Sequence, residues 1–134
     1  MAGRIVLLIG VALALVACAT LQKNSRISEF DDVILAYRRA LLDADYTAVR
    51  HFLDPGVSKA SDTPVNKLVK VVEFNPTNVD VAEDATKIEQ DICLQYYLLN
   101  VPRVKTLQYR QVWHYNAEHR LWLLQTPLPN FDQQ

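Results

Sequence analysis

The most reactive side chains of this 134-residue chain are two cysteines and three histidines, and their spacing does not favour a metal site. Cys18 directly follows an uncharged apolar run, whereas Cys93 lies in an apolar, strand-like segment, where cysteine is typically a small buried hydrophobe. His51, His114 and His119 fall in different predicted elements, so no His/Cys cluster has metal-ligand spacing. We expect no metal and no cofactor.

Nucleophilic catalysis and nucleic-acid binding also lack support in the sequence. There is no Gly-x-Ser-x-Gly, no His-Glu-x-x-His and no phosphate-binding glycine loop, since the only glycines are Gly3, Gly10 and Gly56. The chain has 14 Lys and Arg against 15 Asp and Glu, without a basic cluster. A nucleic-acid groove needs such a cluster, so we expect no nucleic-acid partner.

The segment before Cys18 has the organisation of an export signal. Arg4 precedes an apolar run over residues 5–17, which has the length of a secretory h-region and is too short to span a bilayer. The run ends in Leu15-Val16-Ala17-Cys18, which resembles a bacterial lipobox at every position. The resemblance implies cleavage before Cys18, lipid on its thiol and an acylated new amino end. Ala19, in place of Asp, implies the outer membrane, facing the periplasm, in a Gram-negative cell.

Two alternatives to lipidation stay open. In the first, the tripeptide Ala17-Cys18-Ala19 is the small-x-small site of ordinary secretory cleavage, which would remove Cys18. In the second, the apolar run stays uncleaved as a membrane anchor. If Cys18 carries lipid, Cys93 is the only free thiol and no intramolecular disulfide forms. The sequence therefore predicts a signal peptide at 1–17, a lipidated polar tether at 18–27 and one globular domain at 28–134.

The first part of that domain is predicted to be helical. Ser25 and Ser28 are candidate N-caps, and apolar residues then recur at intervals of three and four up to Leu41. A second, shorter helix is expected from Asp45, its N-cap, to about Asp54, ended by Pro55-Gly56. Residues 56–66 have the composition of a loop.

The remainder predicts a sheet. Strands are expected at 68–75, ended by Pro76, at 87–100, at 104–115 and at 121–126, with a short edge strand at 79–81. In the strand at 87–100, apolar and polar residues alternate with period two, and one face is formed by Ile88, Ile92, Leu94, Tyr96 and Leu98. Helices followed by antiparallel strands predict an α+β domain, with two N-terminal helices packed on a curved antiparallel sheet of about four strands.

This order of elements resembles the NTF2-like superfamily of cone-shaped α+β domains, which includes ketosteroid isomerase-like proteins. The resemblance is carried by residues 36–41 (AYRRAL), by residues 45–55 (DYTAVRHFLDP) and by the Trp-bearing hairpin 111–115 and 120–124. It implies a helix-covered concave sheet and a sheet face that often mediates dimerisation. The fold hosts both enzymes and binding modules, so it does not decide function.

Two sets of residues are candidates for a site in such a domain. Aromatic residues Tyr37, Tyr96, Tyr109 and Trp113 could line an apolar pocket, or equally form an ordinary core. The superfamily's enzymes use a carboxylate base beside hydrogen-bond donors, and here Asp91 would be that base. Asp91 alternates with Glu89 and Gln95 on the polar side of its strand, which favours a solvated position.

These observations predict a membrane-anchored lipoprotein of the bacterial cell envelope with a non-catalytic, ligand- or partner-binding NTF2-like domain. The expected partners are the membrane, through the N-terminal lipid, and a second copy or an envelope protein, through the sheet face. Two alternatives stay open. One is a small pocket enzyme of the isomerase or dehydratase type, and the other is a structural accessory of an envelope complex.

Overall fold

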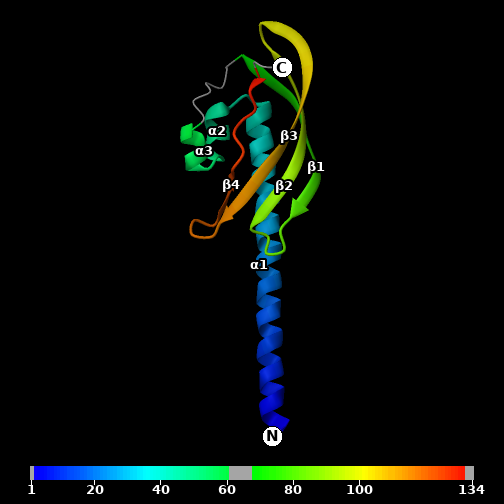
Figure 1. Ribbon diagram of the computed structural model, residues 1–134, viewed down its shortest axis with the longest axis vertical. Coiled ribbons are helices and arrows are strands. Elements are labelled where there is room, and N and C mark those ends of the chain that lie inside the picture. The colour runs from blue at the N-terminus through cyan, green and yellow to red at the C-terminus, as the bar shows by residue number, and fades with distance from the viewer. Residues whose placement is uncertain (1, 61–67, 132–134) are drawn as a thin grey trace.

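The computed structural model describes residues 2–60 and 68–131 of the chain, with side-chain environments for 13–59 and 68–131. Its α+β domain combines one long helix and two short ones with a four-stranded curved antiparallel sheet. Figure 1 shows the domain gathered around the C-terminal half of the long helix, whose N-terminal half projects away from it.

The long helix, α1 (Ala2–Leu42), is one uninterrupted element. The prediction that it begins at Ser25 or Ser28 is wrong, because segment 18–27 is also helical. No glycine or proline occurs between residues 11 and 54, so nothing in the sequence breaks the helix before its end. It ends where Ala44 adopts a φ of 56° and the Asp45 amide donates to the Ala40 carbonyl oxygen at 2.9 Å, a Schellman cap.

Two short helices follow directly. Asp45 caps α2 (Tyr46–His51), because its carboxylate accepts from the Ala48 amide at 3.0 Å, as the sequence predicts. This helix ends earlier than expected, and Pro55 begins α3 (Pro55–Ala60) in place of a loop. Proline suits the first position of a helix, where its missing amide costs nothing. The rest of the expected loop, 61–66, lies outside the described residues.

The sheet has the order β1 (Val69–Val81), β2 (Lys87–Leu98), β3 (Val101–Asn116) and β4 (Leu121–Leu124), all antiparallel neighbours. Pro76 does not end the first strand, because β1 is an edge strand, where proline is tolerated. It lies opposite Ile92 in the β1–β2 register. The expected strands at 68–75 and 79–81 are thus one. Pro102 likewise lies inside β3, which returns from β2 after a two-residue turn.

The core lies between α1 and the inner face of the sheet. Residues of β2 alternate between buried and partly exposed, so Ile88, Ile92, Leu94 and Tyr96 face inward as predicted. From α1, Phe30 and Tyr37 reach the sheet and contact Trp113 edge-on, with ring centroids 5.7 and 5.4 Å away.

Candidate functional site

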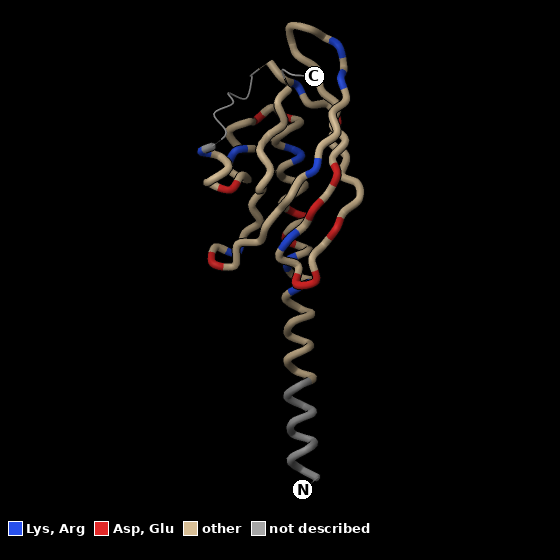
Figure 2. Tube along the Cα trace, in the orientation of Figure 1, with Lys and Arg blue, Asp and Glu red and all other residues tan. Residues whose placement is uncertain are grey.

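Cys18 lies on the part of α1 that projects from the domain, and its side chain is exposed. Every side chain from Leu13 to Gln22 is exposed, and Lys23 is the first that the domain partly covers. Figure 2 shows no charged residue on this stem between residue 13 and Lys23. At a rise of about 1.5 Å per residue, Cys18 stands roughly 7–8 Å along the helix axis from the start of the domain. No helix in the described part of the chain is long and apolar enough to cross a membrane.

The stem is clamped where it enters the domain. The indole Nε1 of Trp122 donates to the Arg26 carbonyl oxygen at 2.9 Å. The Arg26 guanidinium donates to the Asp84 carbonyl oxygen at 3.0 Å and stacks over the Tyr115 ring at 4.9 Å. These contacts join α1 to the β1–β2 turn, β3 and β4. The direction in which Cys18 points away from the domain is therefore set by packing, without a flexible linker.

The inner face holds a polar network that the sequence analysis missed. Gln90 and Gln111 face each other across β2 and β3 and are both fully buried. The Gln111 amide oxygen accepts from Gln90 Nε2 at 3.0 Å and from Trp113 Nε1 at 3.2 Å. Its amide nitrogen donates to the hydroxyls of Tyr109 at 3.0 Å and Tyr37 at 3.5 Å. All four hydrogen-bonding positions of the amide are therefore used.

Three of the four aromatic candidates meet at this network. The side chains of Tyr37 and Trp113 are fully buried, and that of Tyr109 is partly buried. Burial raises the pKa of Tyr37 well above its ordinary value and that of Tyr109 to about 12, so both stay protonated. Tyr96 lies apart, packed against Phe131 at a centroid distance of 4.9 Å, and its hydroxyl donates to the Phe131 carbonyl oxygen at 3.3 Å.

Asp91 lies on the outer face of the sheet, opposite Arg110 in the β2–β3 register. The Arg110 guanidinium donates to Asp91 at 2.8 Å and to Asp80 and Glu89 at 3.1 Å each. A hydrogen bond from Asn78, supported by Arg110, holds the pKa of Asp91 below its usual range. Among the described residues the buried polar side chains are Gln90 and Gln111, so no buried carboxylate stands beside a tyrosine there.

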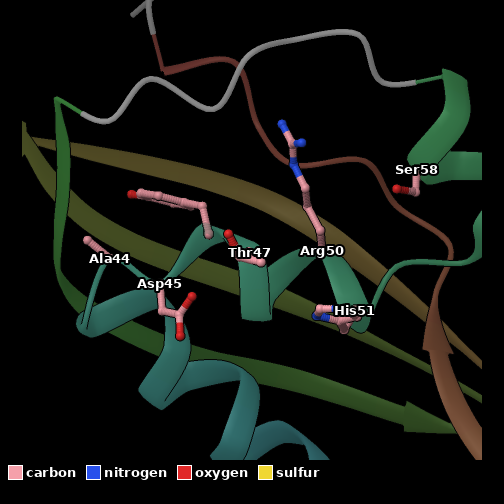
Figure 3. Close-up of a pocket in the computed structure, with 7 residues that line it drawn as sticks. Ala44, Asp45, Thr47, Arg50, His51 and Ser58 are labelled. Carbon is pink, nitrogen blue, oxygen red and sulfur yellow. The ribbon is translucent and has the colours of Figure 1, made fainter.

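A surface groove of about 710 Å³ lies along α2. Figure 3 shows Thr47, Arg50 and His51 on this helix, Asp45 at its N-cap and Ser58 on α3. Tyr46 also lines the groove; its hydroxyl donates to the Val69 carbonyl oxygen at 2.9 Å, and burial raises its pKa to about 12. Arg50 and His51 are exposed, and the Asp45 carboxylate is engaged as the helix cap. The groove brings together no acid–base pair in an apolar setting.

No family model, curated protein or solved structure matches the chain. The chemistry of its own residues is therefore the basis for a functional conclusion. The structure brings Tyr37, Tyr109 and Trp113 together around Gln111, and it places Tyr96 and Cys18 outside this network. Gln90 and Gln111 carried a signal that was overlooked, since each continues the period-two alternation of inward positions in its strand.

Proposed function

We propose that this chain is a lipoprotein of the bacterial cell envelope, anchored through Cys18, whose domain binds a partner and performs no catalysis. The observation that carries the proposal is the position of Cys18. It ends a lipobox-like tetrapeptide and lies exposed on a stem, five residues before the first side chain that the domain partly covers. In a Gram-negative cell, Ala19 favours the outer membrane with the domain in the periplasm.

The exposure of Cys18 suits the lipid attachment to its thiol and the cleavage before it. Processing enzymes need an extended or exposed substrate, and no residue of the domain covers this thiol. Lipid on Cys18 contributes about 0.8 kcal/mol per buried CH₂, so several acyl chains anchor the protein stably. The clamped stem then holds the domain beside the bilayer surface.

We assign the domain to the NTF2-like type and its function to binding. A long helix across a curved antiparallel sheet, closed by the β3–β4 hairpin, is consistent with that architecture. Tyr37 and Trp113, which would line an open pocket, instead pack edge-on against each other and share Gln111. Asp91 lies on the outer face of the sheet, paired with Arg110, and its lowered pKa makes the carboxylate a weaker proton acceptor.

The outer face of the sheet is the surface that we propose for the partner, either a second copy or an envelope protein. It presents polar and charged side chains along β2 and β3 over a shallow hollow of about 500 Å³. Arg110 and Asp91 line this hollow, and the side chains of the Arg110 cluster stay in contact with solvent. Charged surface groups of this kind contribute to the choice and orientation of a partner.

The anchor is tested by replacing Cys18 with Ser in the full-length chain. The wild-type protein should incorporate a labelled fatty acid, lose residues 1–17 and fractionate with membranes, whereas Cys18→Ser should stay an unlabelled precursor. Cys93→Ser is the matched control and should be labelled and processed as the wild type. Normal cleavage of Cys18→Ser, or release of an unlabelled wild-type protein from membranes, would contradict the proposal.

A further inference from the structure

A small groove lies at the base of the stem, on the side of the domain nearest Cys18. Its volume is about 280 Å³, and it is formed between α1 and the β1–β2 turn. Ala19, Lys23 and Arg26 line it from the helix, and Glu83 and Asp84 line it from the turn. In Figure 1 this turn lies beside α1, at the point where the helix leaves the domain. Its size is below that of pockets for drug-sized ligands, so the groove suits a small polar group.

The charged groups of this groove fall into two kinds. Arg26 is engaged with the turn and with Tyr115, and the Asp84 carboxylate accepts from the Thr86 amide at 3.1 Å and hydroxyl at 2.7 Å. These contacts hold the two walls of the groove in place. Lys23 and Glu83, in contrast, make no ion pair with any residue that the structure describes. Among the described residues that line the groove, Lys23 on the helix and Glu83 on the turn are thus a cation and an anion without an ion-pair partner.

Lipid on Cys18 would place this groove in the head-group layer of the membrane. The hydrocarbon core of a bilayer is about 30 Å thick and the whole bilayer about 40–45 Å, which leaves roughly 5–8 Å of head groups on each side. Lys23 stands about 7–8 Å along the helix from Cys18. The groove lining, from Ala19 to Lys23, therefore spans the depth that phospholipid head groups occupy.

We propose that this groove binds the head group of a phospholipid that carries both a phosphate and a primary ammonium, taken from the membrane in which Cys18 is anchored. Lys23 would contact the phosphate and Glu83 the ammonium. A primary ammonium has three hydrogens to donate to a carboxylate, whereas a quaternary ammonium has none. The groove would therefore distinguish phosphoethanolamine from phosphocholine lipids. The proposal rests on the lipid anchor at Cys18.

The test uses the full-length protein, processed in cells and reconstituted in bilayer discs of equal parts phosphoethanolamine, phosphocholine and phosphoglycerol lipids. Native mass spectrometry of the released protein reads both its covalent lipid and the phospholipids that stay bound. We expect the phosphoethanolamine lipid to be enriched at least threefold over the phosphocholine lipid. Lys23→Gln should lower the retention of every phospholipid, and Glu83→Gln should abolish the preference for phosphoethanolamine.

Lys59→Gln on α3 and Glu118→Gln in the β3–β4 turn are the matched controls and should retain lipid as the wild type does. Equal retention of the phosphoethanolamine and phosphocholine lipids would overturn the proposal, as would strongest retention of the phosphoglycerol lipid. Failure of the anchor itself is seen separately, because the protein mass would then lack covalent acyl chains.

Discussion

Two adjacent residues of β3, Arg110 and Gln111, are the centres of two polar networks on opposite faces of the same sheet. Gln111 faces inward, is fully buried and uses all four hydrogen-bonding positions of its amide. Arg110 faces outward, and its side chain remains 41% exposed while it contacts three carboxylates. Both networks are well formed, but water competes only with the outer one.

The buried network around Gln111 contributes to the stability of the fold, whereas the exposed cluster around Arg110 is accessible at the surface. In a buried network every group must find a protein partner, because an unsatisfied buried donor costs about 1–3 kcal/mol. The Gln111 network therefore fixes how β2, β3 and α1 pack. Exposed ion pairs contribute little to stability, since water and salt replace them readily. The Arg110 cluster can consequently exchange its contacts for those of a partner at low cost.

Replacing Gln111 with Leu should produce the largest loss of stability. The substitution leaves the amide of Gln90 and the indole N–H of Trp113 in the core without a hydrogen-bond acceptor, which costs about 1–3 kcal/mol for each donor. We expect the free energy of unfolding to fall by about 3 kcal/mol and the Tm by about 12 °C for a domain of this size. Thermal unfolding followed by circular dichroism measures the change.

Gln108→Leu is the matched control, because the same side chain is replaced in the same strand on the exposed face. Its Tm should stay within about 2 °C of the wild type. The double variant Gln90→Leu/Gln111→Leu should be less destabilised than the sum of the single variants, since it removes one stranded donor. Equal effects of Gln111→Leu and Gln108→Leu would show that the inner network contributes nothing to stability.

Replacing Trp122 with Phe should have an intermediate effect at the base of the stem. The variant keeps an aromatic ring against Phe30 but loses the hydrogen bond to the Arg26 carbonyl oxygen. We expect the free energy of unfolding to fall by about 1–2 kcal/mol. Hydrogen exchange should accelerate in α1 near Arg26 and stay unchanged near Tyr37. Unchanged exchange near Arg26 would argue against a clamped stem.

The sheet was largely predictable because its signal is local. Alternation of Ile88, Ile92, Leu94 and Tyr96 with polar residues identifies both the strand and its buried face. The prediction at Pro76 was wrong because the cost of proline depends on whether the strand lies at an edge, which is a property of the whole sheet. Strand order cannot be derived from the residues around the proline.

The prediction at Cys18 and the network around Gln111 depend on different kinds of information, and the lipidation of Cys18 stays a prediction. Cys18 is defined by neighbouring residues, whereas the partners of Tyr37 come from β3, far along the chain. The capping residues Ser25 and Ser28 were misleading because a Ser is a helix start only where the chain before it is not already helical. The register between β2 and β3, which places Gln90 opposite Gln111, depends on the buried face of each strand and on the turn that joins them.

Replacing Arg110 with Gln should have the smallest effect at neutral pH and a characteristic pH dependence. Lys87, supported by Arg110, holds the pKa of Glu89 below its usual range, and Asn78 with Arg110 does the same for Asp91. A lowered pKa in the folded state stabilises the protein at pH values above the ordinary carboxyl range, and this contribution disappears as the pH falls through the lowered pKa values.

The Tm of Arg110→Gln should therefore lie only a few °C below that of the wild type at pH 7. The two should converge only when the pH falls below the ordinary carboxyl range, to about pH 3, where these carboxylates become protonated in the folded protein. Added salt should reduce the difference at pH 7, because the groups are exposed. A difference that persists at pH 3 and in high salt would mean that Arg110 acts through packing, and the contrast with Gln111 would then no longer hold.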